Sequence, residues 1–139
     1  MLLEFTVLGE PKGKARHRTT KSGFTYTPKE QIQYENLVKI SFQEAYPNWV
    51  PTDKEIVHVD ISAYFLTPKA FSKSKRELIQ MDLLHPMKKP DVDNIAKSIL
   101  DSLNNIVYLD DKQVTCCVVS KYYDDKPRVD VSIMIKEDI

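Results

Sequence analysis

Four stretches of the chain are predicted to be strands: residues 3–7, 57–65, 113–123 and 128–136. Hydrophobic and polar residues alternate along the first two. Because successive side chains of a β-strand point to opposite faces of a sheet, this period predicts half-buried strands. The last two stretches flank the turn-forming residues Asp-Asp-Lys-Pro, so we expect them to form an antiparallel hairpin.

Apolar residues spaced three and four positions apart predict helices elsewhere in the chain. Tyr34 and Phe42 belong to such a face between residues 28 and 45. Thr27 is the expected N-cap of this helix, because Pro28 suits its first turn.

Two further helices are predicted in the second half of the chain. Residues 69–81 are expected to form a short basic helix that packs Leu78 and Ile79 inward. Residues 92–104 carry an apolar stripe at helical spacing. Asn105 is expected to end that helix in a left-handed conformation.

The composition is that of a globular protein with one core. The chain has 139 residues, of which 42% are hydrophobic and 29% charged. We therefore expect a single α+β domain over residues 1–139, with helices packed on an antiparallel or mixed sheet. No apolar run approaches the ~20 residues that cross a membrane. The adjacent Cys116 and Cys117 are expected to be free thiols, which favours a cytoplasmic location.

Positive charge is concentrated between the first strand and the first helix. Residues 9–28 are rich in turn formers, and a short hairpin is expected about Ser22 and Gly23. The chain has 20 Lys plus Arg and 20 Asp plus Glu, so segregation of charge, and not net charge, indicates a polyanionic partner. The basic residues expected to contact DNA are Lys12, Lys14, Arg16, Arg18 and, further along the chain, Lys89. A solvated loop without function is the alternative.

Negative charge gathers around the predicted helix at residues 92–104. The aspartates of this segment are Asp91, Asp93, Asp101, Asp110 and Asp111. Asp93, Lys97 and Asp101 are four residues apart and share one helix face. A short connection after the helix could fold Asp110 and Asp111 back over its start, beside Asp91 and Asp93. Oxygen ligands of this kind suit Mg²⁺ or Mn²⁺, which could activate water against a phosphoryl group.

Each acidic feature also has a structural interpretation. An aspartate at a helix start is a common cap, and two aspartates before a strand are a common turn. Lys97 could form a surface pair with Asp93 or face a phosphate beside a metal. A calcium loop fits poorly, because Ala96 and Ser102 replace the glycine and the final glutamate of an EF-hand.

Three runs of sequence form one pattern: KPDVDNIAK at residues 89–97, DSLN at 101–104 and LDDKQV at 109–114. This pattern resembles the signature of the RusA family of Holliday-junction resolvases. The basic PKGKARHR segment and the YTP before the first helix are similar to phage and prophage members. Ser102 stands where the family usually has alanine, and Asn105 where glycine is frequent. Neither departure touches a catalytic position.

The resemblance implies a RusA-like fold and an Mg²⁺-dependent endodeoxyribonuclease, for which Mn²⁺ could substitute. Such an enzyme acts as a homodimer that nicks four-way DNA junctions symmetrically, in recombination and repair, in a bacterial cell or a phage-infected host. The family's catalytic and metal-binding aspartates fall on Asp91, Asp93 and Asp111, with Asp110 as a further metal candidate. Its essential lysine falls on Lys97.

Three other functions fit parts of the sequence. A nuclease acting on flaps or duplexes would use the same acidic residues. A DNA-binding accessory protein of replication or recombination would carry the basic loop with an inactive site. A calcium-binding module would bind Ca²⁺ without DNA.

Overall fold

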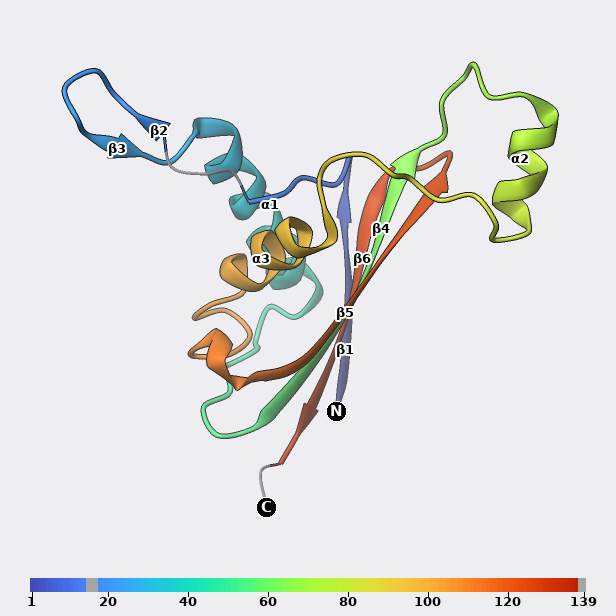
Figure 1. Cartoon of the computed structure of the whole chain (residues 1–139). Coiled ribbons are helices and arrows are strands. Elements are labelled where there is room, and N and C mark those ends of the chain that lie inside the picture. Colours follow the sequence, from blue (N-terminus) through green and yellow to red (C-terminus); the bar gives the residue numbers. More distant parts are fainter. Residues whose placement is uncertain (15–17, 138–139) are drawn as a thin grey trace.

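A computed structural model describes residues 1–14 and 18–137 of the chain (Figure 1). Its elements, in chain order, are β1 (Leu2–Leu8), β2 (Arg18–Thr19), β3 (Thr25–Tyr26), α1 (Lys29–Ala45), β4 (Ile56–Leu66), α2 (Lys73–Gln80), α3 (Val92–Ser102), the 3₁₀ turn η1 (Asp111–Gln113), β5 (Val114–Asp124) and β6 (Arg128–Lys136). The expected α+β domain is confirmed, because helices pack on a mixed four-stranded sheet.

The strands of the main sheet lie in the order β1-β6-β4-β5. β6 is antiparallel to both β1 and β4, whereas β5 is parallel to β4. The hairpin predicted for the last two strands is therefore wrong, because β4 lies between β5 and β6. The turn stands where it was expected, but it carries the chain across the end of β4. A long crossover containing α2 and α3 joins the parallel strands β4 and β5.

One face of the sheet carries the core, under α1 and α3 (Figure 1). The alternation predicted which strand residues face it. The buried strand residues are Leu3, Phe5, Val7, Val57, Val59, Ile61, Ala63, Phe65, Val129, Val131, Ile133 and Ile135. The apolar stripe of α3 is also confirmed, since Ile95, Ile99 and Leu103 are buried. This packing fixes α3, and the residues at its two ends, against the sheet.

Several local predictions can be compared with backbone angles. Asn105 has φ 63°, as predicted, but it does not end the helix, because α3 ends at Ser102 with Leu103 as its C-cap. Gly23 has φ 89° in the β2–β3 hairpin. The N-cap of α1 is Pro28, with no side-chain capping bond, so the prediction of Thr27 as the cap is wrong. The helix begins at Lys29, because Pro28 adopts an extended ψ of 142°.

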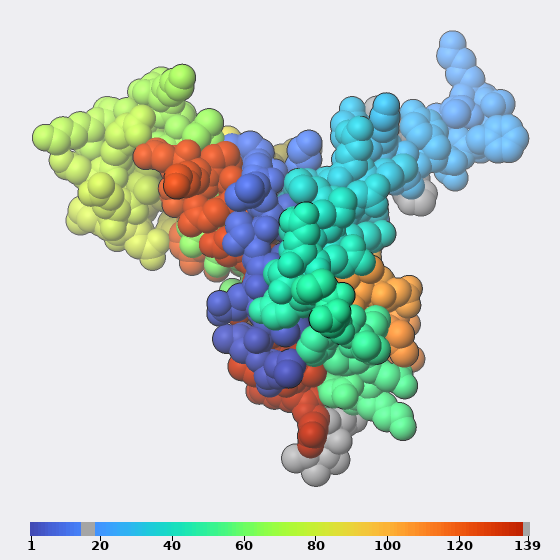
Figure 2. All heavy atoms as spheres, turned by 180° about the vertical axis from the view of Figure 1, so that it is seen from behind, coloured from blue at the N-terminus to red at the C-terminus, as the bar shows by residue number. Residues whose placement is uncertain are grey.

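Two parts of the chain stand off the body, as Figure 2 shows: the β2–β3 hairpin and α2. α2 is capped by the Ser72 hydroxyl, which accepts from the Lys75 backbone N–H. None of its residues is buried, and Leu78 is 40% exposed, so the predicted inward packing of Leu78 is wrong. Ile79 is half-buried. No helix in the described ranges has the length and apolar character needed to span a membrane.

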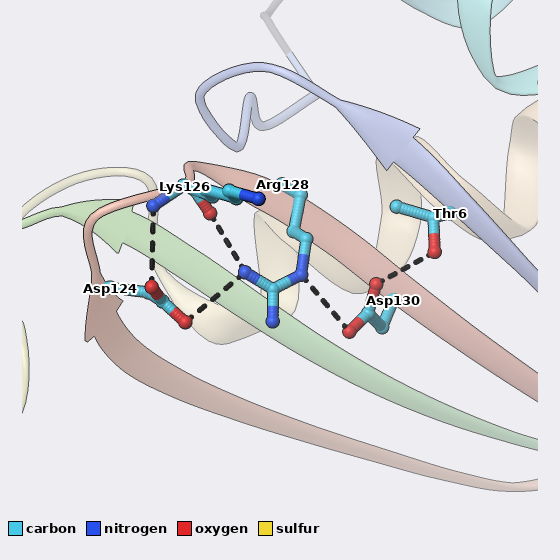
Figure 3. Close-up of polar contacts among 5 residues, drawn as sticks. All are labelled: Thr6, Asp124, Lys126, Arg128 and Asp130. Atoms are coloured by element: carbon cyan, nitrogen blue, oxygen red, sulfur yellow. Dashed lines mark hydrogen bonds and ion pairs between the residues drawn. The ribbon is translucent and has the colours of Figure 1, made fainter.

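The turn between β5 and β6 is held by one arginine (Figure 3). The Arg128 guanidinium donates to Asp124 at 3.2 Å and to Asp130 at 3.3 Å. It also donates to the carbonyl of Lys126 at 2.9 Å, and Thr6 on β1 donates to Asp130 at 2.8 Å. These contacts tie β1, β5 and β6 together at one end of the sheet.

Candidate functional site

The N-terminal end of α3 presents two carboxylates. Asp91 occupies the N-cap position with extended backbone (φ −71°, ψ 160°), and Asp93 lies in the first turn. The position of Asp91 agrees with the sequence prediction, but its side chain makes no capping hydrogen bond. Both residues are exposed, and the positive end of the helix dipole offsets part of their mutual repulsion. Their oxygen atoms are donors of the type that Mg²⁺ takes.

A second acidic group lies beyond the other end of α3. Asp110 caps η1 by accepting from the backbone N–H of Lys112 at 2.9 Å, and this bond lowers the pKa of Asp110. Burial raises the pKa of the adjacent Asp111, and the nearby Asp110 and Asp101 raise it further. The side chain of Asn104 offsets part of this rise by hydrogen bonding to Asp111. Asp110 and Asp101 therefore both lie near enough to Asp111 to disfavour its charged form.

These two acidic groups are separated by the length of the helix. Asp91 and Asp101 are ten residues apart, which corresponds to ~15 Å along a helix axis. Over residues 1–14 and 18–137, no group of three or more His, Cys, Asp or Glu side chains is arranged to hold a metal. The short connection after the helix was expected to bring Asp111 beside Asp91 and Asp93. Within one chain, the three side chains do not come together in this way.

Lys97 lies on the exposed surface of α3, between the two groups. The surface pair considered for Asp93 and Lys97 is not among the ion pairs formed by the described residues. The lysine that contacts α3 is instead Lys14, which reaches Asp101 from the basic loop. The ammonium of Lys97 thus remains accessible to a ligand that approaches this face.

Lys14 joins three segments of the chain. Its ammonium lies 2.7 Å from Glu35 on α1 and 3.2 Å from Asp101 on α3. Its backbone N–H donates to the carbonyl of Asn94 at 3.0 Å. Lys14 was predicted to contact DNA, and the structure shows that its charge is already held by two carboxylates. Its place in the fold is to fix the loop against both helices.

The ion pairs of Lys14 stabilise the charged forms of Lys14 and Glu35. Burial lowers the pKa of Lys14, but the hydrogen bonds and charges of Glu35 and Asp101 outweigh it, so the net shift is upward. Burial raises the pKa of Glu35, but hydrogen bonds from Lys14 and Gln31 outweigh it, so the net shift is downward. Lys14 and Glu35 are therefore both ionised near neutral pH.

The docked loop and the start of α3 enclose a groove beside Asp91. Its volume is about 760 Å³. The lining residues come from two short segments and from α3; they are Pro11, Lys12, Gly13, Lys14, Lys89, Pro90, Asp91 and Asn94. Two of the predicted DNA contacts, Lys12 and Lys89, thus lie beside the predicted metal ligand Asp91. Cations close to a carboxylate pair suit a phosphate that shares a metal with it.

The remaining predicted DNA contacts are Arg16 and Arg18. Arg16 lies outside the described residues, and Arg18 is placed only as a backbone position of β2. Near the hairpin end, Phe24 is 74% exposed and Tyr26 47% exposed. Exposed aromatic side chains beside basic residues can stack on nucleobases.

Some residues that build the site carry no clear signal in the sequence. A Cβ atom on Gly13 would lie 2.8 Å from the Cβ of Pro90 and 2.9 Å from that of Asn94, so only glycine allows this approach of the loop. Tyr108 is fully buried and donates to the carbonyl of Leu100 at 2.6 Å. That bond anchors the connection that leads to Asp111.

Comparisons with known proteins agree with the sequence signature. A sequence model of the family described as "Endodeoxyribonuclease RusA" matches residues 9–134. A relative from Bacillus subtilis (strain 168), named "Uncharacterized protein YqaN", is 36% identical over 136 residues. The alignment covers 94% of this chain and 94% of the relative. The family match includes both acidic groups, Lys97 and the basic loop.

Proposed function

Because the chain belongs to the RusA family of endodeoxyribonucleases, we propose that it resolves four-way DNA junctions by paired, symmetric nicking in recombination and repair. The family is metal-dependent, and the proposed cofactor is Mg²⁺, with Mn²⁺ as a substitute. The observation that carries the proposal is the family match over residues 9–134, a range that holds Asp91, Asp93, Lys97 and Asp111.

We infer that the active form is a homodimer. The two acidic groups of one chain lie at opposite ends of α3, ~15 Å apart along the helix, which is too far for one metal ion. In a two-fold dimer, Asp111 of the partner subunit can join Asp91 and Asp93 of this chain. Two such sites would also match the two equivalent phosphates of a four-way junction.

The proposed ligands are Asp91, Asp93 and Asp111, with Asp110 as an additional candidate. A metal bound there supplies a Lewis acid that activates water and stabilises charge on the phosphate. Lys97 is proposed to contact the scissile phosphate, since its ammonium is exposed on the face that links the two acidic groups. The positive helix end near Asp91 favours the same phosphate.

The groove beside Asp91 is proposed to receive the DNA backbone. Lys12 and Lys89 line it, and Arg16 and Arg18 are proposed as further DNA contacts from the sequence alone. Lys14 lines the same groove, but its charge is balanced by Glu35 and Asp101. We therefore assign it mainly to positioning the loop, and expect the other four residues to carry most of the salt dependence of binding.

Junction cleavage by an Asp93→Asn variant tests this function. The substitution removes a proposed metal ligand while keeping the shape of the side chain. We expect at least a ~100-fold loss of nicking in Mg²⁺, since even outer partners of metal ligands cost 10- to 100-fold. Binding to the junction in the absence of metal should persist. Asp125→Asn, in the exposed β5–β6 turn, is the matched control and should cleave normally.

Synthetic substrates separate this function from its rivals. The wild-type chain is tested on a four-way junction, a flap and a duplex of the same sequence. Preferential nicking of the junction supports a resolvase, and preferential cleavage of the flap indicates a nuclease for other branched DNA. Wild-type cleavage by Asp93→Asn would contradict the assigned site. Binding without cleavage in Mg²⁺ and Mn²⁺ would identify a DNA-binding accessory protein.

A further inference from the structure

β5 forms one outer edge of the main sheet. The carbonyl of Asp124 faces β4. It accepts a hydrogen bond at 2.9 Å from the N–H of Thr67, the residue that follows the last residue of β4. The carbonyl of Lys121 faces the other way, 2.7 Å from His85 Nδ1. Backbone groups alternate in direction along a strand. From Cys116 onward β5 pairs with β4 in regular register, so the residues whose N–H and C=O groups point away from the sheet are Cys117 and Val119. Thr115 lies at the register shift between Val57 and His58 and is not included.

These outward groups are unpaired in the described chain. Among residues 1–14 and 18–137, no hydrogen bond from outside the β4 ladder reaches Cys117 or Val119. The run from Thr115 to Val119 holds no charged residue and no proline, and Val118 is 49% exposed. A long apolar edge of this kind is a template for pairing with another strand.

The opposite edge of the sheet, β1, differs from β5 in its length, in the pairing of its backbone and in its charge. It has seven residues, against eleven in β5. The Glu4 N–H, which belongs to this edge strand, donates to the Tyr46 hydroxyl at 2.8 Å. The Glu4 carboxylate also places a charge on this strand, which opposes pairing with a second copy. The two edges are therefore not equivalent, and β5 is the one open to a partner.

We propose that a second copy of this chain pairs antiparallel with β5, around a two-fold axis near Cys117. This proposal rests on the homodimer of the proposed function and names its surface. Antiparallel pairing of one strand with its own copy is two-fold symmetric, and the neutral run meets itself without charge repulsion. His85 covers the edge at Lys121, so the open segment is centred on Cys117. The product is a continuous eight-stranded sheet.

The same pairing would bring the acidic group of one chain close to the other acidic group of its partner. β5 begins directly after η1, which carries Asp111. The other end of β5 lies near the segment that leads into α3, because Lys121 Nζ donates to the Lys88 carbonyl. Antiparallel strands place the start of one beside the end of the other. The partner's Asp111 is thus brought toward the end of α3 that carries Asp91 and Asp93.

A proline substitution tests the edge directly. Cys117→Pro removes a backbone donor that points away from β4, so the ladder inside the chain is retained. We expect the sedimenting species to shift from the mass of two chains to that of one, with circular dichroism of the wild-type form. Cys117→Ser keeps the N–H and is the matched control, which should remain dimeric.

Cross-linking provides a second test that does not depend on the folding of the proline variant. Residues facing each other in a hydrogen-bonded antiparallel pair have Cα atoms about 5.5 Å apart, within the range that a disulfide spans. Mild oxidation of Cys116→Ser, which retains Cys117, should therefore link two chains. A chain with both cysteines replaced by serine and Thr6 by cysteine, on β1, should not link.

The outcomes distinguish this surface from the function on which it rests. A wild-type dimer that nicks junctions, while Cys117→Pro stays dimeric or Cys117 fails to cross-link, overturns the surface and leaves the function intact. A wild-type chain that sediments as a monomer overturns the surface as well. A dimer that links through Cys117 but cleaves no junction supports the surface and contradicts the function.

Discussion

At the scale of single residues, Lys14 is the clearest case of a side chain whose place the sequence did not reveal. It belongs to a run of basic residues, and such runs usually remain solvated or bind polyanions. Its partners, Glu35 and Asp101, belong to different helices, and Glu35 is 21 positions away in the chain. Charge counting along the sequence cannot detect such contacts, because they exist only after α1 and α3 have packed.

Glu35→Gln is expected to lower the stability of the fold near neutral pH. The folded pKa of Glu35 lies below its unfolded value of 4.5, so its stabilisation is present above that value and lost as the pH falls through the folded pKa. Removing the carboxylate should cost about 1 kcal/mol at pH 7. The difference from wild type should shrink in acid.

Urea unfolding at pH 7 and at pH 3 measures this effect. Glu44→Gln is the control, because Glu44 lies on the same helix and is exposed. An equal difference from wild type at both pH values would show that the ion pair with Lys14 does not contribute through its charge.

At the scale of elements, the approach of the basic loop to α3 depends on Gly13. A Cβ atom at this position would lie 2.8 Å from Pro90 and 2.9 Å from Asn94, closer than packed carbon atoms approach. Gly13→Ala should therefore push the loop from the helix start and destabilise the fold by about 1–3 kcal/mol. Thermal unfolding of this variant beside Lys12→Ala, which changes an exposed neighbour, measures the cost. Equal melting temperatures would mean that the loop is not packed against α3.

The elements show what a local pattern can and cannot predict. Alternation identified β1 and β4 and the faces they bury, because it follows from side-chain direction within one strand. It did not identify neighbours, and so the predicted hairpin of β5 and β6 was wrong. The neighbours of a strand depend on its position in the sheet, which tertiary packing decides. β6 lies between β1 and β4, and its inward-facing residues are buried.

At the scale of the whole molecule, the sequence named acidic residues but not their arrangement. Spacing correctly put Asp91 and Asp93 at a helix start and Asp111 before a strand. It also suggested that the connection would return to the helix start. Instead, buried Tyr108 bonds to the Leu100 carbonyl and fixes the connection at the far end of α3. The distance between the two acidic groups follows from tertiary packing, which no short motif encodes.

Mixing two inactive variants distinguishes sites within one chain from sites between chains. In a dimer with shared sites, a chain carrying Asp93→Asn and a chain carrying Asp111→Asn form one site with both changes and one site with none. Random reassociation makes half of the dimers mixed, so about a quarter of all sites should be intact and nicking should return to about a quarter of the wild-type rate. Each variant alone should stay inactive, and a mixed dimer with one intact site should nick one strand without resolving the junction. If nicking does not return although mixed dimers are present, each site belongs to a single chain, and metal binding would have to draw Asp111 toward the start of α3.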